Sequence, residues 1–223
     1  MISAPSLGNL RTAVSFAAEE FAQSRARQEK RLDEGMAWRE LVACLVGGAT
    51  RYEHAAAATD TICLQLPAPW NISRRAWRDI RSGFHNGAVV VPTRFPREHA
   101  RYIASAIEVL YVGGGGLGAM LDGPAHVLRA DLTRNILGIG PKQASLFLLN
   151  TGVTDDVAVL DRHVLRYMVW IGAIDGARPP RSLREYEAVE STFRDHAEAL
   201  GFAVADLDRA AWLASKVWGE ICQ

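Results

Sequence analysis

Apolar residues recur every three to four positions along most of the chain, with charged and polar residues between them. This spacing is typical of amphipathic helices rather than strands. Residues 89–91 (VVV) could form a short strand, but one isolated strand does not make a sheet. We therefore predict an all-α fold of about nine helices with no repeat of fixed period. The predicted helices include 6–32, 37–48, 51–66, 73–83, 97–112, 125–137 and 183–200.

Two breaks interrupt this pattern. The stretch GFHNGAVVVPTRFP, residues 83–96, ends one predicted helix and delays the next. The stretch GGGGLGAMLDGP, residues 113–124, is the one segment of low complexity. Glycine-rich segments of this kind form flexible loops, so we predict that a domain junction lies there.

Composition describes an ordinary globular protein. The chain has 223 residues, 49% of them hydrophobic, and a mean hydropathy near zero. No run of eighteen apolar residues predicts a membrane span, and the first residues do not resemble a secretion signal. We expect a cytoplasmic protein, associated with the nucleoid if it acts on DNA, whose three distant cysteines (Cys44, Cys63 and Cys222) are free thiols.

The charged residues balance, with 25 basic and 25 acidic side chains. Proteins that only coat nucleic acid are usually basic, so any binding of nucleic acid must come from a local patch. The six histidines and three cysteines show no metal-ligand spacing. We therefore predict no metal and no cofactor.

The stretch LGIGPKQASLFLLN, residues 137–150, predicts a turn between two helices. Gly138 and Gly140 allow backbone angles and close approaches that other residues exclude. Pro141 suits the first position of the following helix. The amides at that helix start favour an anion such as a DNA phosphate. A tight helix–helix turn that binds nothing explains the glycines equally well.

Lys142 follows this turn in a chain with three lysines and twenty-two arginines. An arginine stays protonated, whereas a lysine that is partly buried at a helix start can lose its proton and act as a nucleophile. A plain cation that contacts phosphate is the alternative interpretation.

Asp161 lies nineteen residues after Lys142, where the N-cap of the next amphipathic helix is expected. A helix cap is the usual role of an isolated aspartate at such a position. The combination of hairpin, lysine and aspartate makes a role in chemistry the better interpretation of both charged residues.

This constellation resembles the helix-hairpin-helix glycosylase superfamily, which includes endonuclease III and the 8-oxoguanine DNA glycosylases. The motif GIGPKQASLFLLN and the later VAVLDRHVLR look most like the short prokaryotic 8-oxoguanine glycosylase/lyases. The segments RFPREHARYIASA (94–106) and LDRAAWLASK (207–216) extend the resemblance. It covers the chain from about residue 35 to the end and is strongest over 134–167.

The resemblance implies a two-lobed all-α fold with its active site in the cleft between the lobes. We expect the N-terminal helix (1–34) to pack with the C-terminal lobe (125–223), and residues 35–124 to form the middle lobe. It also implies a bifunctional DNA glycosylase/AP lyase that excises 8-oxoguanine. Lys142 would attack the sugar and form a Schiff base before β-elimination. Asp161 would stay ionised and stabilise positive charge on the sugar.

The resemblance also suggests a pocket for a base rotated out of the duplex. Asp208 would accept hydrogen bonds from the N–H groups of guanine, and Trp212 would stack on the base. Packing in the core is the alternative for Trp212. Residues expected to contact DNA are Gly138, Gly140, Arg162, His163 and Arg166. A solvated helix face is the preferred interpretation of Arg74, Arg78 and Arg81.

Two departures from the family pattern concern the choice of substrate. The segment that usually supplies Gln or Asn to fill the gap left by the flipped base has the residues GGAT at 47–50. Either another side chain inserts, such as His85 or Asn86, or duplex DNA is not the usual substrate. The chain ends at Gln223 instead of the family's terminal lysine.

Three hypotheses for the function therefore stand. The first is the 8-oxoguanine glycosylase/lyase, a monomer that acts on DNA away from membranes. The second is the same chemistry on another base or on single-stranded nucleic acid, in a role such as phage defence. The third is a binding module that uses the hairpin and catalyses nothing.

Overall fold

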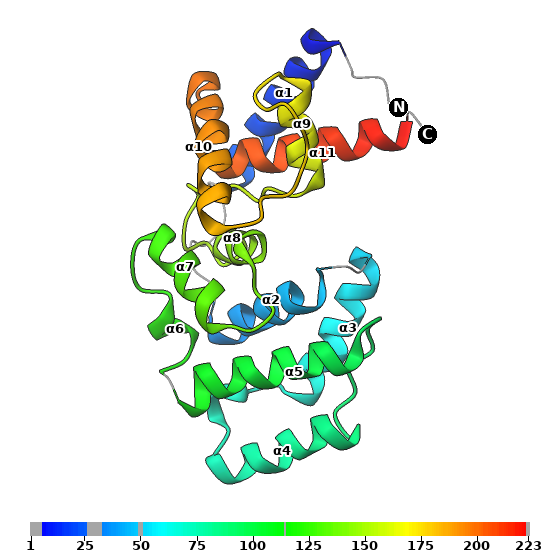
Figure 1. Ribbon diagram of the computed structural model, residues 1–223, viewed down its shortest axis with the longest axis vertical. Coiled ribbons are helices and arrows are strands. Elements are labelled where there is room, and N and C mark those ends of the chain that lie inside the picture. The colour runs from blue at the N-terminus through cyan, green and yellow to red at the C-terminus, as the bar shows by residue number, and fades with distance from the viewer. Residues whose placement is uncertain (1–5, 26–32, 49–50, 114, 222–223) are drawn as a thin grey trace. The chain divides into compact units, whose positions relative to one another are not determined.

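The fold is entirely helical over the residues that the computed structural model describes, which are 6–25, 33–48, 51–113 and 115–221. These residues contain eleven α-helices, a 3-10 turn and a π-helical turn, and no β-strand (Figure 1). The all-α prediction is confirmed. The helices are α1 (Leu7–Arg25), α2 (Glu34–Val46), α3 (Tyr52–Gln65), α4 (Arg74–Asn86), α5 (Pro96–Ile107), α6 (Leu117–Met120), α7 (Ala125–Asn135), α8 (Pro141–Asn150), α9 (Arg162–Trp170), α10 (Leu183–Leu200) and α11 (Val204–Ile221), with the 3-10 turn η1 (Pro69–Asn71) and the π-helical turn η2 (Glu108–Val112).

Two compact units make up the chain. The terminal unit combines Met1–Glu29 with Thr154–Gln223 and therefore holds α1 and α9 to α11. The middle unit, Lys30–Val153, holds α2 to α8. Each unit has its own buried hydrophobic cluster.

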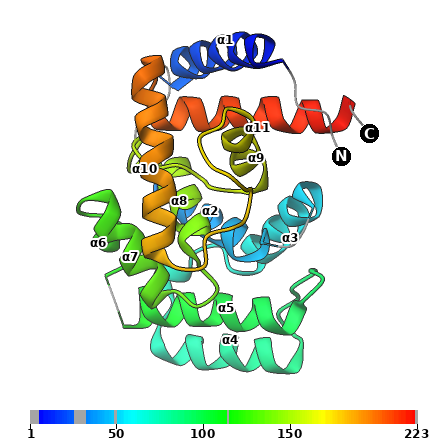
Figure 2. The ribbon, with the colours of Figure 1, turned by 45° about the horizontal axis from the view of Figure 1, so that its top comes forward.

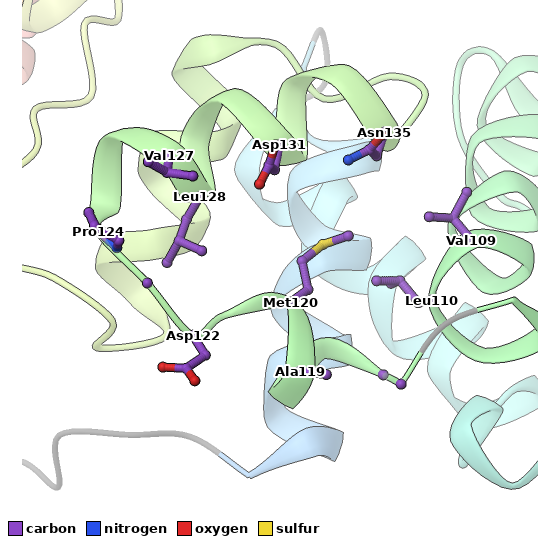
Figure 3. A pocket seen from close by; sticks show the side chains of 13 residues that line it. Val109, Leu110, Ala119, Met120, Asp122, Pro124, Val127, Leu128, Asp131 and Asn135 are labelled. Carbon is purple, nitrogen blue, oxygen red and sulfur yellow. The ribbon is translucent and has the colours of Figure 1, made fainter.

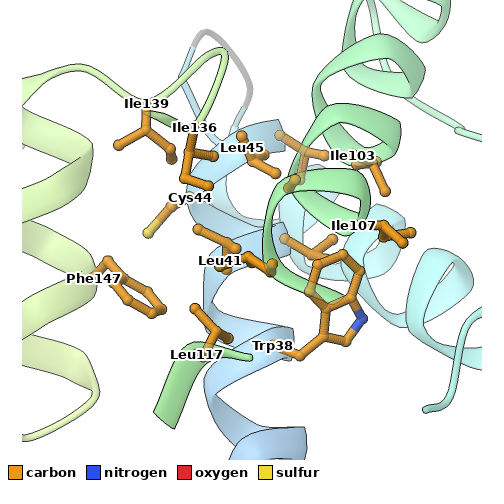
Figure 4. Packing of buried hydrophobic residues seen from close by; sticks show 14 of the residues in the cluster. Trp38, Leu41, Cys44, Leu45, Ile103, Ile107, Leu117, Ile136, Ile139 and Phe147 are labelled. Carbon is orange, nitrogen blue, oxygen red and sulfur yellow. The ribbon is translucent and has the colours of Figure 1, made fainter. Parts of the chain in front are cut away.

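The boundary between the units differs from the sequence prediction. The predicted C-terminal lobe, 125–223, included both helices of the hairpin, whereas α7 and α8 belong to the middle unit. Ile136, Ile139 and Phe147 are buried in one cluster with Leu41 and Cys44 of α2 (Figure 4). Because the apolar face of the hairpin is covered by α2, the change of unit falls after α8, between residues 153 and 154.

The glycine-rich segment 113–124 is a loop within the middle unit and not the junction that we predicted. It contains the short helix α6, whose first amides are bound by a side chain from α2. The Glu34 carboxylate accepts hydrogen bonds from the Leu117 amide at 2.7 Å and the Gly118 amide at 3.0 Å. A carboxylate at a helix start satisfies amides that have no partner inside the helix. This contact ties α6 to α2.

The predicted break at 83–96 begins at Gly87, because the helix extends three residues beyond its predicted end at residue 83. Helix α4 continues through Asn86 and ends at Gly87, which has a left-handed φ of 82°. No strand forms at residues 89–91. Instead the Gln65 side chain pairs with Val90 in both directions, accepting from its amide at 2.8 Å and donating to its carbonyl at 2.9 Å. The Gln65 side chain therefore satisfies the backbone N–H and C=O of Val90, which in a sheet a neighbouring strand would satisfy.

The terminal unit is built around α11. Helix α1 lies along α11, which also contacts α9 (Figure 2). Leu10, Val14 and Ala18 are buried at four-residue spacing, so one face of α1 supplies its part of the core. The predicted helix at 6–32 is confirmed over 7–25, and residues 26–32 lie outside the described chain.

None of the described helices is long and apolar enough to cross a membrane. Two of the three cysteines lie in the described chain, and both are free thiols, as predicted: Cys44 is buried and Cys63 is partly buried. Cys222 and Gln223 lie outside the described residues.

Candidate active site

The two glycines of the hairpin turn, Gly138 and Gly140, differ in backbone angle and in the space around them. Gly138 has a φ of 91°, and a Cβ built there would lie 2.5 Å from the ring of Tyr102. Gly140 has a φ of −96°, and a Cβ there would lie 3.4 Å from the nearest atom, Oε1 of Gln143. Both backbone angle and space therefore require glycine at 138, whereas the fold tolerates a side chain at 140.

Helix α8 starts without a side-chain cap. Gly140 is its N-cap residue and Pro141 occupies the first position, as the sequence predicts. No side chain accepts a hydrogen bond at this cap. The helix start is therefore open to an anion, which its amides and dipole both favour.

Lys142 is the second residue of α8 and is partly buried. It forms no ion pair with another described residue. Burial raises the pKa of the Cys44 thiol, and Glu40 raises it further, whereas Lys142 acts in the opposite direction. The lysine therefore lies within electrostatic range of Cys44 on α2. No carboxylate of the described residues forms an ion pair with it.

Gln143 is a residue at this helix start that the sequence analysis did not single out. A Cβ built at Gly48 would lie 3.4 Å from its Nε2 atom, so the amide of Gln143 lies beside Gly48 as well as Gly140. Residues 49 and 50 lie outside the described chain. Asn86 belongs to α4, where its side chain accepts from the Ala88 amide at 3.0 Å. Of the two side-chain amides, that of Gln143 lies at the hairpin and that of Asn86 does not.

Asp161 caps α9, as predicted, with one carboxylate oxygen. Oδ1 accepts hydrogen bonds from the amides of His163 at 2.7 Å and Val164 at 2.9 Å. Oδ2 accepts none from the described residues, and the side chain is partly exposed. A structural role and a chemical role are therefore compatible, since each uses a different oxygen.

Trp212 lies at the surface of α11, where it is 37% exposed. Core packing, the alternative interpretation from the sequence, is therefore wrong for this residue. The His163 ring meets it edge-on, with ring centres 5.8 Å apart. The Lys216 ammonium lies 4.8 Å from the centre of the Trp212 ring. Lys216 was missed in the sequence, although its spacing of four residues from Trp212 is that of neighbours on one helix face.

His163 lies among the cations of this surface. Its pKa is lowered mainly by burial, Asp161 opposes this, and Arg162, Arg166 and Lys216 lower it further. Its Nε2 accepts from Nε of Arg162 at 3.2 Å, and its buried Nδ1 has no partner among the described residues. Three cations therefore gather beside Asp161. A local cluster of positive charge of this kind is what the sequence analysis required of a chain with zero net charge, and its contact with DNA stays a prediction.

Asp208 of α11 is buried and lies within electrostatic range of Asp161. Its side chain is 5% exposed, and its Oδ1 accepts a hydrogen bond from the Val159 amide at 2.8 Å. Burial raises its pKa well above the ordinary value, as do Asp161 and Glu190, while the Val159 hydrogen bond and Arg209 oppose the shift. One carboxylate oxygen of Asp208 is therefore already occupied. Its predicted contact with a base stays a prediction.

The other basic residues singled out in the sequence lie on α4. Arg74, Arg78 and Arg81 are exposed, and Arg81 forms an ion pair with Glu108 at 3.7 Å. Helix α4 packs on α5 (Figures 1 and 2). The preferred interpretation, a solvated helix face, agrees with this exposure.

A cavity of about 370 Å³ lies elsewhere in the middle unit, between η2, α6 and α7 (Figure 3). Val109, Met120 and Leu128 line its apolar part, and Asp122 and Asp131 lie at its polar part. Neither Lys142 nor the glycines of the hairpin line it. No group of three potential metal ligands occurs within the described ranges.

Comparison with known proteins gives one family. The family described as 8-oxoguanine DNA glycosylase, Ogg-HhH, matches residues 14–202. An 8-oxoguanine DNA glycosylase/AP lyase of Thermotoga maritima is 38% identical over 123 residues, which are 55% of this chain and 57% of that protein. A protein of the same description from Metallosphaera sedula is 31% identical over 203 residues, which are 91% of this chain and 90% of its own.

Solved structures agree with this match. The crystal structure of the 8-oxoguanine DNA glycosylase of Thermotoga maritima is 27% identical, with a TM-score of 0.62 over 92% of this chain and 89% of that one. The Methanocaldococcus jannaschii 8-oxoguanine glycosylase/lyase in complex with a 15mer DNA containing 8-oxoguanine is 25% identical. Its TM-score is 0.61 over 91% of this chain and 88% of that one. The chain therefore belongs to the 8-oxoguanine DNA glycosylase family and has its helix-hairpin-helix fold.

Proposed function

We propose that the protein is a bifunctional DNA glycosylase/AP lyase that excises oxidised guanine. The observation that carries the proposal is Lys142, a partly buried primary amine without an ion pair in the described chain, at the open start of the second hairpin helix. The relatives described as 8-oxoguanine DNA glycosylase/AP lyase support the same activity.

In the proposed reaction the neutral amine of Lys142 attacks the anomeric carbon of the damaged nucleotide. The bond to the base breaks, and the base leaves with the bonding electrons and takes up a proton. The amine–sugar adduct opens the sugar ring and becomes a Schiff base, whose positive charge makes the neighbouring C2′ proton acidic. Loss of that proton expels the 3′ phosphate by β-elimination, and water then releases the lysine.

Asp161 supports this chemistry through its uncapped oxygen. Oδ2 faces no donor among the described residues, so its negative charge is available to stabilise positive charge on the sugar. We propose that Lys142 and Asp161, which belong to different units, act on the same nucleotide.

The DNA backbone is held from both units in this proposal. The turn at Gly138 and Gly140 and the open start of α8 bind one phosphate. Arg162 and Arg166, with Lys216 as an addition from the structure, bind phosphates on the side of Asp161. His163 lies between these cations and contributes a ring nitrogen to the same surface.

Recognition of the base falls to α11. Trp212 is exposed, and stacking on an aromatic face is worth about 1–3 kcal/mol per base. Asp208 lies one turn earlier on the same helix, and its Oδ2, which accepts no hydrogen bond from the described residues, is the acceptor left for guanine N–H groups. The protein acts as a monomer on DNA in the cytoplasm, at the nucleoid, and needs no cofactor.

Borohydride trapping tests the proposal. The protein is incubated with oligonucleotides that carry 8-oxoguanine or another lesion, in single- and double-stranded form, and borohydride reduces any Schiff base to a stable adduct. Wild type should form the adduct with 8-oxoguanine DNA, and Lys142→Gln should not. An adduct with other lesions or single strands alone would support the second hypothesis. DNA binding without an adduct or strand cleavage on any substrate would support the binding module.

A further inference from the structure

The four residues before Asp161 form a buried segment that is neither helix nor strand. Their exposed fractions are small, from 0% for Ala158 to 8% for Val159. Strands with such continuous apolar sequence normally lie inside a sheet, where neighbouring strands satisfy their amides. Here there is no neighbouring strand in the described chain, so these buried amides need other partners.

Side chains from α10 and α11 supply partners for three of these four amides. The Ala158 amide donates to Oε1 of Glu190 at 2.9 Å, and the Val159 amide donates to Oδ1 of Asp208 at 2.8 Å. The Leu160 amide donates to the hydroxyl of Tyr186 at 3.0 Å. Three consecutive amides are therefore held by three side chains of two helices.

Tyr186 holds the segment on both sides of Val159. Its hydroxyl accepts from the Leu160 amide and donates to the Ala158 carbonyl at 2.7 Å. The next amide, that of Asp161, donates to the Val159 carbonyl at 2.6 Å. One hydroxyl group therefore fixes the backbone immediately before the residue that caps α9.

We propose that Tyr186, Glu190 and Asp208 are positioning residues that set the place and direction of the Asp161 carboxylate. This inference rests on the proposed function, in which Asp161 acts on the sugar. The cap of α9 fixes only the Oδ1 side of the carboxylate, whereas the three side chains fix the backbone from which it projects. Catalytic groups lose rate steeply with misplacement, by about 100-fold for 1 Å.

Tyr186→Phe is the decisive variant, because it removes both hydrogen bonds of the hydroxyl and keeps the ring. Single-turnover borohydride trapping on 8-oxoguanine duplex gives a rate constant and a final amplitude. We expect the rate constant to fall about 10-fold or more while the amplitude and the Kd for DNA stay within about 2-fold of wild type. A merely structural role would lower the amplitude and the melting temperature and leave the rate constant of the folded fraction unchanged.

Tyr167→Phe is the matched control. Tyr167 is buried in the same unit, and its hydroxyl shares a hydrogen bond with Nε2 of His196 at 2.8 Å, away from the segment 157–160. This variant should lose stability without loss of the trapping rate constant. Equal rate constants for wild type and both variants would overturn the proposal, as would equal losses in the two variants.

Glu190 offers a second comparison that separates the hydrogen bond from the charge. Glu190→Gln keeps an oxygen that accepts from the Ala158 amide and should keep most of the rate, whereas Glu190→Ala should lose it. Hydrogen exchange of residues 157–161 is the readout that does not need activity, and Tyr186→Phe should accelerate it. If wild type forms no adduct on any lesion, the proposed function fails. If wild type reacts and Tyr186→Phe exchanges and reacts like it, the positioning role alone fails.

Discussion

The Val159 amide and the Asp208 carboxylate are joined by a hydrogen bond of 2.8 Å, two residues before Asp161. This bond and the burial of Asp208 support the positioning role proposed above, and the contact of Asp208 with a base stays a separate prediction. A buried carboxyl whose pKa is raised prefers its neutral form. This preference gives a dependence of stability on pH.

Asp208→Asn tests that dependence. The folded-state pKa of Asp208 lies above the unfolded value of about 4, so the folded protein binds the proton more tightly. The stability from the neutral carboxyl is fully present below about pH 4 and is lost as the pH rises through the folded-state pKa. Wild type should therefore lose stability relative to Asp208→Asn between pH 4 and 8 in urea unfolding. A constant difference across this range would contradict the assignment.

Gly138→Ala and Gly140→Ala form a matched pair in the hairpin. Gly138 has a left-handed φ and no room beside the ring of Tyr102, so alanine should cost about 3 kcal/mol of unfolding free energy. Gly140 has an ordinary φ and open space, so alanine should cost at most about 1 kcal/mol. Chemical denaturation measures both. Equal losses would show that the turn has a different conformation.

Lys142→Arg separates charge from nucleophilicity. The guanidinium keeps the positive charge at the start of α8 but does not lose its proton near neutral pH. We expect the Kd for lesion DNA to stay within about 3-fold of wild type, since only charge is needed for the phosphate. Borohydride trapping and strand cleavage should both vanish. Residual trapping would show that a different amine reacts.

Asp161→Asn and Asp161→Ala divide the two roles of the carboxylate. Asparagine is as good an N-cap as aspartate, so its Oδ1 can accept the same amides and stability should hardly change. Alanine removes the cap and should cost about 0.5–2 kcal/mol. Both should lose at least about 100-fold in the trapping rate, because both lack the negative charge. Thermal melts and single-turnover kinetics on the same samples would show whether cap and charge separate in this way.

The sequence predicted the elements well wherever local chemistry decides them. The N-cap role of Asp161 and the helix start at Pro141 follow from the residue types themselves, and both are confirmed. Helical periodicity likewise predicted α10 to the residue. These features depend on neighbours within a few positions, which the sequence shows directly.

Prediction failed where distant residues decide. The segment 113–124 was interpreted as a junction because its glycines indicate flexibility, but Glu34, eighty-three residues from Leu117, binds the start of α6. The support of residues 157–160 by Glu190 and Asp208 joins residues thirty-two and forty-nine positions apart. No local pattern in the sequence identifies such partners, because a glutamate or aspartate that accepts a buried hydrogen bond is the same residue type as one exposed to solvent.

Trp212→Ala tests recognition of the base at the surface of α11. Trp212 is 37% exposed, so its removal also costs packing, and the unfolding free energy is measured on the same samples. If a flipped base stacks on it, the Kd for 8-oxoguanine duplex should rise by a factor of about 5 to 150, which corresponds to 1–3 kcal/mol. The Kd for undamaged duplex should stay constant, because phosphates dominate that binding. Leu213→Ala, which removes an apolar neighbour that is 38% exposed, is the control and should change neither Kd. Fluorescence anisotropy on both duplexes separates the outcomes: equal weakening for damaged and undamaged DNA would mean that Trp212 contacts the backbone, and no change in either would remove it from the site.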